Sequence, residues 1–195
     1  ILFGQLAPRW DEADWLPLRV ASTAFGGTFT ARLMDEVRVK RGLSYGASAR
    51  TGAGRGRPML WMHVFPSAAQ TPETLELVLR LYREWADGGL RDDEVEFAKG
   101  YLARGFAFRI ETPESRLGLR TELELCGMPA DYIARFPSRV LEVSPQAVAE
   151  ATRRWLRPAD LLVTLVGTGE TLAGPLADVP RLREAARQTF AYDSY

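Results

Sequence analysis

Histidine and cysteine are almost absent from this sequence of 195 residues, which contains one of each, His63 and Cys126. A catalytic zinc usually takes three protein ligands, and carboxylates alone make a poor zinc site. We therefore expect no metal site in this chain. His63 is interpreted as a hydrogen-bonded or solvent-facing strand residue, and Cys126 as a small residue of the core. A Ser-His-Asp or Cys-His nucleophile is compatible with the counts, but no G-x-S-x-G motif or other local pattern supports one.

The chain also lacks a long apolar run and a net charge. No uninterrupted apolar stretch approaches 18 residues, so no membrane span is expected, and no signal peptide is visible. The 25 basic and 25 acidic side chains balance, so bulk charge favours neither nucleic acid nor an anionic membrane as a partner. We expect a soluble protein of the bacterial cytoplasm or periplasm, and the sequence does not distinguish these two compartments.

Hydrophobic residues make up 46 % of the chain, enough to fill a substantial core, and its length suits one domain. The chain begins with the residues Ile-Leu-Phe-Gly, within a predicted strand. We therefore expect residues 1–195 to be a single α+β domain and a fragment of a longer chain. The predicted sheet is mixed and largely antiparallel, with helices packed on one face.

Local patterns predict the elements around this sheet. Three helices are expected to begin with a hydroxyl N-cap followed by proline, at Thr71-Pro72, Thr112-Pro113 and Ser144-Pro145. Periodicity predicts further helices and strands. One predicted helix begins at 10–12, and further helices are predicted over 92–109, 113–126, 130–136, 145–155 and 181–187. Strands are predicted over 1–7, 43–49, 59–65 and 161–167. The last of these strands is expected to be buried on both faces. An extended tail is expected through Phe190 and Tyr192.

The segment from Phe25 to Tyr45 has the most chemical definition. A Gly26-Gly27 pair is predicted to open a helix with one apolar stripe, on residues Phe29, Leu33 and Val37. Gly42 is predicted to end that helix in the left-handed conformation, and a strand carrying Tyr45 should follow.

Arg38 and Tyr45 are the candidate functional residues of this segment. Arg38 lies at the border of the apolar stripe, and Tyr45 lies about 10 Å of extended chain past Gly42. The hydroxyl of Tyr45 and the guanidinium of Arg38 are therefore expected to converge. Both side chains donate hydrogen bonds at neutral pH and neither is a base. Two donors directed at one point suit a peptide carbonyl or a developing oxyanion. On spacing alone the ordinary interpretation is favoured, namely a helix-ending arginine and a tyrosine at a wet strand edge.

A family resemblance changes that balance. The residues Gly26-Gly27, Phe29, Arg32-Leu33, Glu36, Arg38, Lys40, Arg41-Gly42-Leu43 and Tyr45 resemble the signature of the pitrilysin/insulinase family of zinc metallopeptidases, the inverzincins. Glu94, Ala98 and Lys99 resemble the family's E-L-x-x-A-K helix. The resemblance is to the half-domain that has no H-x-x-E-H motif and that carries an arginine and a tyrosine seven residues apart, as Arg38 and Tyr45 are.

The resemblance implies a division of labour between two homologous domains. It assigns zinc and the H-x-x-E-H motif to a partner domain or subunit, with no cofactor in this chain. It assigns binding of the substrate backbone and oxyanion stabilisation to Arg38 and Tyr45, in proteolysis of an unfolded peptide. The chain would then be a metallopeptidase component that is inactive alone, in a heterodimer or a linked pair of domains. The alternative is a catalytically inactive scaffold domain of the same fold, as in the core subunits of respiratory complexes, and a plain peptide-binding module is the weakest interpretation.

Overall fold

The sheet is small and antiparallel. The computed structural model describes residues 1–177, 179, 185–186 and 188–190. Within them the sheet has four strands in the order β2-β3-β1-β4, all paired antiparallel. The strands are β1 (Leu2–Leu6), β2 (Ala47–Thr51), β3 (Met59–Val64) and β4 (Leu162–Thr164). The prediction of a largely antiparallel sheet is confirmed, and no parallel pair was found within the described strands.

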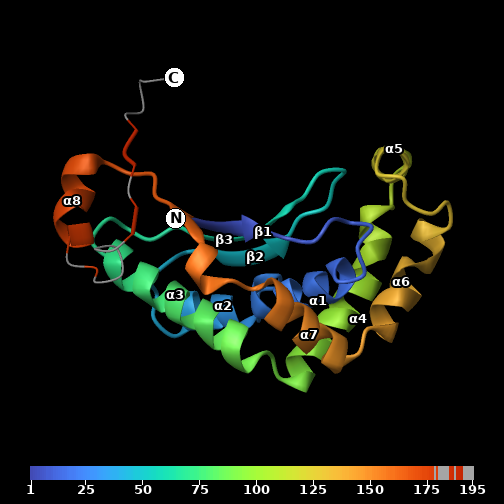
Figure 1. Ribbon diagram of the computed structural model, residues 1–195, viewed down its shortest axis with the longest axis horizontal. Helices are drawn as coiled ribbons and strands as arrows, with labels where there is room; N and C mark the ends of the chain where they lie inside the picture. Colours follow the sequence, from blue (N-terminus) through green and yellow to red (C-terminus); the bar gives the residue numbers. More distant parts are fainter. Residues whose placement is uncertain (178, 180–184, 187, 191–195) are drawn as a thin grey trace.

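Helices cover one face of this sheet, as predicted. In Figure 1 helices α1, α3 and α7 lie beneath the strands, whereas α5 stands away at one end of the molecule. The elements are α1 (Trp15–Gly26), α2 (Arg32–Met34), the π-helix η1 (Asp35–Val39), α3 (Thr71–Gly88), α4 (Asp92–Arg109), α5 (Pro113–Leu125), α6 (Tyr132–Glu142), α7 (Pro145–Trp155), the 3-10 turn η2 (Pro158–Asp160) and α8 (Gly169–Ala177). None of the described helices has the length and apolar character needed to cross a bilayer.

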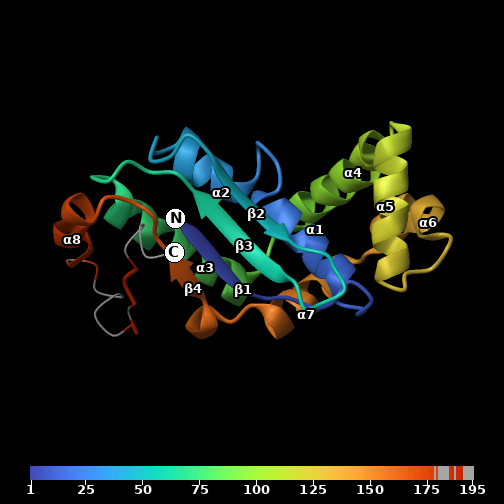
Figure 2. The ribbon, with the colours of Figure 1, turned by 90° about the horizontal axis from the view of Figure 1, so that it is seen from above.

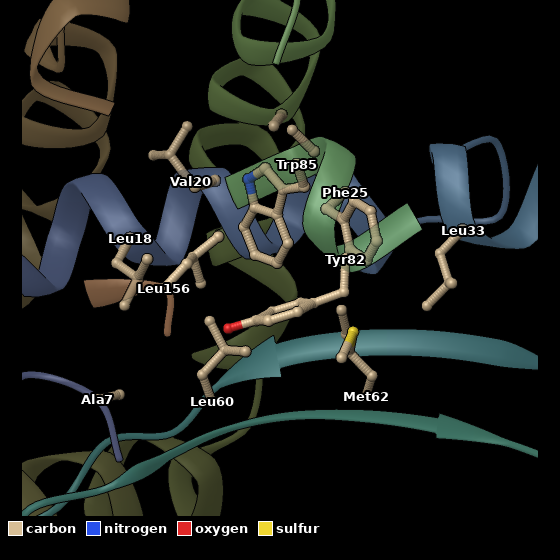
Figure 3. Packing of buried hydrophobic residues seen from close by; sticks show 14 of the residues in the cluster. Ala7, Leu18, Val20, Phe25, Leu33, Leu60, Met62, Tyr82, Trp85 and Leu156 are labelled. Carbon is tan, nitrogen blue, oxygen red and sulfur yellow. The ribbon is translucent and has the colours of Figure 1, made fainter. Parts of the chain in front are cut away.

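The core lies between the strands and the helices beneath them. Phe3, Leu60 and Met62 point from the sheet into this layer and are fully buried. Figure 3 shows Trp85 of α3 between the sheet and helix α1. Its indole stacks on the ring of Phe25, with 4.4 Å between the ring centroids. Aromatic burial of this kind contributes most of the hydrophobic stabilisation in a core.

A polar network joins strand β1 to the helix layer. The side-chain amide of Gln5 donates to the carbonyl of Trp155 (2.7 Å), and its oxygen accepts from the hydroxyl of Tyr82 and from the amide of Arg157 (3.1 Å). Because Gln5 is buried, these bonds satisfy a group that would otherwise be costly to desolvate. Burial raises the pKa of Tyr82 above its ordinary value, so this phenol stays protonated.

The strand predicted over 161–167 is shorter and more exposed than expected. Strand β4 spans Leu162–Thr164, pairs with β1 at the edge of the four described strands, and leaves Leu162 69 % exposed. The prediction of burial on both faces is therefore wrong. Its apolar run lies at the sheet edge, and within the described residues helices cover one face of this sheet. Helix α8 was not predicted.

Helix ends follow the local signals in most places. Helices α4 and α7 have the predicted bounds. The hydroxyls of Thr112 and Ser144 cap α5 and α7 by accepting hydrogen bonds from the backbone amides of Ser115 and Ala147. Helix α1 begins at Trp15 rather than at 10–12, and α6 continues past Pro137 to Glu142. Helix α3 begins one residue early, so Gln70 takes the N-cap position predicted for a threonine. The helix predicted over 181–187 and the tail through Tyr192 fall largely outside the described residues.

Candidate functional site

A glycine at the end of α1 brings that helix against strand β2. A Cβ atom on Gly26 would lie 2.7 Å from both the backbone nitrogen and the Cβ of Ala49. No side chain fits in that space, so the close approach requires glycine. The Gly26-Gly27 pair therefore ends α1, with Gly27 at its C-cap, rather than opening the next helix as predicted. Figure 2 shows α2 beside β2, at the edge of the sheet.

The helix that carries Arg38 changes geometry halfway along. Leu33 and Val37 are fully buried, as predicted, and they hold the segment on the core. Beyond them the amide of Lys40 donates to the carbonyl of Asp35 (2.9 Å), which is the i to i−5 bond of a π-helix. Gly42 then takes a left-handed conformation (φ 62°) and ends the helix, as predicted. The wider turn changes the direction of the residues that follow. The prediction of a regular α-helix did not include this change.

The neighbouring charges of this turn pair with one another. The ammonium of Lys40 contacts the carboxylates of Glu36 (2.6 Å) and Asp35 (2.9 Å), and the guanidinium of Arg41 also binds Glu36. Hydrogen bonds from Lys40 and Arg41 lower the pKa of the Glu36 carboxyl below its ordinary value. No ion pair was found between Arg38 and any acidic side chain of the described residues. Its guanidinium is the cation of this turn that remains available to a ligand.

Tyr45 is held by the residue before it. The buried hydroxyl of Ser44 donates to the carbonyl of Gly46 (2.6 Å) and accepts from the amide of Phe65 (2.7 Å). These bonds fix the segment to the end of β3 and leave the Tyr45 side chain 84 % exposed. Strand β2 begins only at Ala47. The predicted strand over 43–49 is thus correct in its second half, and Tyr45 lies in the connection before it.

The guanidinium of Arg38 contacts the ring of Tyr45, and a third residue joins them. The central carbon of the Arg38 guanidinium lies 4.7 Å from the ring centroid of Tyr45 and 4.7 Å from that of Phe29. Both distances are typical of cation–π contacts. Phe29 was predicted to face the core, but it precedes α2 in a turn and its side chain is 63 % exposed. That prediction was wrong because the helix begins at Arg32, so Phe29 lies outside its apolar stripe.

An ion pair anchors this segment to helix α4. The guanidinium of Arg32 donates to both carboxylate oxygens of Glu94, at 3.0 and 2.5 Å, and also to the carbonyl of Gly89 (3.3 Å). The two side chains are 19 % and 11 % exposed. The same carboxylate accepts the amide of Arg91 (2.8 Å) in a capping box. The start of α2 and the start of α4 are therefore fixed to each other.

His63 and Cys126, the residues suited to metals or nucleophilic chemistry, lie in other segments of the chain than Arg38 and Tyr45. No group of three or more His, Cys, Asp or Glu side chains within the described range could hold a metal ion. His63 lies on strand β3, with its ring centroid 4.1 Å from that of Phe65. Partial burial lowers the pKa of His63 below its ordinary value. Cys126 is partly buried against the core, and burial raises the pKa of its thiol, which disfavours the nucleophilic thiolate.

Three features of the site were not evident in the sequence. The first is the pair of hydrogen bonds made by Ser44, a residue type that carries no special signal in the sequence. The second is the ion pair of Arg32 and Glu94, which are 62 positions apart. The third is the contact of Phe29 with Arg38, which depends on where the helix begins. Arg32 and Glu94 are both among the residues that carry the family resemblance, but nothing in their spacing indicates that they pair.

Two curated relatives match most of the chain. It is 28 % identical over 145 residues to an uncharacterized zinc protease of Streptomyces coelicolor, covering 74 % of this chain and 31 % of that protein. It is 22 % identical over 155 residues to the non-peptidase homolog YmxG of Helicobacter pylori, covering 80 % of this chain and 36 % of that protein. The chain thus spans about a third of the length of these relatives.

A solved structure and a family model agree with these relatives. The peptidase M16 inactive domain from Pseudomonas fluorescens has a TM-score of 0.71 and 24 % identity, covering 82 % of this chain and 38 % of that one. This likeness supports the fold. A family model described as the peptidase M16 inactive domain matches residues 1–102, which is more than half of the chain. The chain therefore belongs to the peptidase M16 family and corresponds to its inactive domain.

Proposed function

We propose that this chain is the non-metal-binding half of a zinc metalloendopeptidase. In this role Arg38 holds a main-chain carbonyl of an unfolded peptide and Tyr45 donates a hydrogen bond to the oxygen that becomes an oxyanion during cleavage. The observation that supports it most directly is the 4.7 Å distance between the central carbon of the Arg38 guanidinium and the centroid of the Tyr45 ring, which places the two side chains against each other. An arginine without an acidic partner keeps its N–H groups for a ligand.

The zinc would belong to a homologous partner bearing H-x-x-E-H, either a second subunit or a linked domain. The residues of this chain do not fit a zinc ion, because one histidine and one cysteine cannot supply the usual ligands. In the proposed assembly the partner's H-x-x-E-H residues would hold the zinc, which would supply Lewis-acid activation of water, and the peptide would add as an extended strand to the edge of the partner's sheet. This chain would be inactive alone.

A scaffold function is the second candidate, and one comparison favours it. The chain resembles a non-peptidase homolog nearly as well as it resembles a zinc protease. The contacts of Arg38 with two rings also give these residues a structural role that needs no catalysis. Catalytic and scaffold functions differ in whether the hydroxyl of Tyr45 is needed.

The test is peptide cleavage by the chain together with a homologous protein or domain that bears H-x-x-E-H, assayed on an unfolded, internally quenched fluorescent peptide. Tyr45→Phe keeps the ring and removes only the hydroxyl. Loss of one such donor should lower kcat by about 10²-fold or more. Arg38→Gln should also lower kcat/KM. Unchanged turnover in Tyr45→Phe would favour the scaffold function.

Metal analysis gives an independent test of the division of labour. The purified chain should contain no stoichiometric zinc, and the assembly with its partner should contain one zinc. Stoichiometric zinc in this chain alone would contradict the proposal.

A further inference from the structure

Phe29 exposes an aromatic ring next to the candidate site without filling the core. Its side chain is 63 % exposed, and the contact found for its ring is the guanidinium of Arg38. Exposed aromatic residues are common on proteins and usually need no explanation. Phe108 of α4, for example, is 77 % exposed. What distinguishes Phe29 is the group that it contacts.

Arg38 contacts more aromatic rings than any other arginine among the described residues. Three arginine–ring contacts were found there: Arg38 on Phe29, Arg38 on Tyr45, and Arg57 on Trp155. Rings from two separate segments, the turn before α2 and the connection before β2, therefore converge on one guanidinium. The segments themselves are fixed, one by the Arg32–Glu94 ion pair and the other by the Ser44 hydroxyl.

Two rings restrict the guanidinium in a way that an ion pair would not. An aromatic ring covers the face of the planar group and leaves its N–H bonds free at the edge. An acidic partner would instead occupy those N–H bonds. A long arginine side chain also loses rotamer freedom when it binds a ligand, and ordering it beforehand reduces that cost.

We propose that Phe29 is a positioning residue of this site, acting through Arg38. Its ring and that of Tyr45 hold the guanidinium so that its N–H edge faces the peptide main chain. The identity of the ligand rests on the proposed function, whereas the ordering of Arg38 by Phe29 does not. Tyr45 then has two separable parts, a ring that orders Arg38 and a hydroxyl that meets the substrate.

The ordering is tested by NMR of the Arg38 Nε–Hε group in the free protein, assigned by its absence in Arg38→Lys. In the wild type this signal should be shifted upfield by the rings and should show restricted motion. Phe29→Leu should lose part of the shift and gain motion, whereas Phe29→Trp should retain both features. Phe108→Leu is the matched control, and Tyr45→Phe should also leave the signal nearly unchanged.

Cleavage in the assembly gives the second measurement. Phe29→Leu should lower kcat/KM about two- to five-fold, since one exposed cation–π contact is worth about 0.5–1 kcal/mol, and Phe29→Trp should restore it. The Tm of Phe29→Leu should fall by no more than about 2–4 °C, because the ring is outside the core and one exposed contact is lost. An Arg38 signal that is unchanged in Phe29→Leu would overturn the inference, even if Tyr45→Phe abolished cleavage. If the signal changes but Tyr45→Phe cleaves normally, the positioning role stands and the proposed catalytic function fails.

Discussion

The ion pair between Arg32 and Glu94 should stabilise the fold measurably. Glu94→Gln removes the charge but keeps a side-chain oxygen that can still accept the amide of Arg91, which lies 2.8 Å away in the native protein. Arg32→Met removes the guanidinium and keeps an apolar stem. These two substitutions and their combination form a double-mutant cycle that isolates the pair.

The expected magnitude follows from the burial of the pair. Exposed ion pairs contribute about 0–1 kcal/mol, and breaking a fully buried pair costs about 3–5 kcal/mol. With 19 % and 11 % of the two side chains exposed, Glu94→Gln should cost about 2 kcal/mol. For a chain of this length that corresponds to a fall in Tm of roughly 4–8 °C. Glu94→Ala should cost about 1 kcal/mol more, because it also removes the cap of α4.

Urea unfolding followed by circular dichroism measures these free energies. The coupling energy of Arg32→Met and Glu94→Gln should be about 1–2 kcal/mol. Arg80 and Glu84 form a matched control on α3, at 3.8 Å and with 55 % and 56 % exposure. Their coupling should be about 0.3–0.5 kcal/mol. Equal coupling in the two pairs would refute the argument that burial of the Arg32–Glu94 pair gives it strength.

Two further predictions concern a glycine and the histidine. Gly26→Ala should destabilise the protein by about 1–3 kcal/mol in urea unfolding, because its methyl would meet the backbone of Ala49. Gly118→Ala, with open space around the new methyl, should instead stabilise it by about 0.5–1 kcal/mol, and equal effects would contradict the steric explanation. The NMR titration of His63 should give a pKa below 6.5, since burial disfavours the imidazolium. The unfolded chain then binds more protons than the folded protein just below pH 6.5, so the free energy of unfolding should fall as the pH drops through that window. His63→Asn should remove this contribution. A pKa of His63 at or above 6.5 would contradict burial as the cause of the shift.

Elements with strong local signals could be predicted from the sequence. The caps at Thr112 and Ser144 and the left-handed Gly42 depend on a few adjacent residues, and all three were predicted correctly. The family-specific fold class was also correct, since the strands pair antiparallel and the helices lie on one face. Arg38 and Tyr45 were expected to converge, and their side chains do meet.

Features that depend on distant contacts could not be predicted in this way. The apolar run containing Leu162 is predicted to be buried, yet its burial depends on which distant segments cover that side of the sheet, and among the described residues Leu162 is exposed. The inward stripe proposed for Phe29 assumed a continuous α-helix, whereas the observed helix begins later and widens into a π-turn. Whether Tyr45 lies in a strand depends on where Ser44 binds the end of β3.

The π-turn between Asp35 and Val39 gives the site a dependence on chain length. An α-helix advances by 100° per residue, and the i to i−5 bond from Lys40 accommodates one residue more than an α-turn would. The direction of the Arg38 side chain therefore depends on how many residues lie in this turn as well as on which residues they are. Relatives that lack this extra residue would point the same side chain elsewhere, even with an identical arginine and tyrosine.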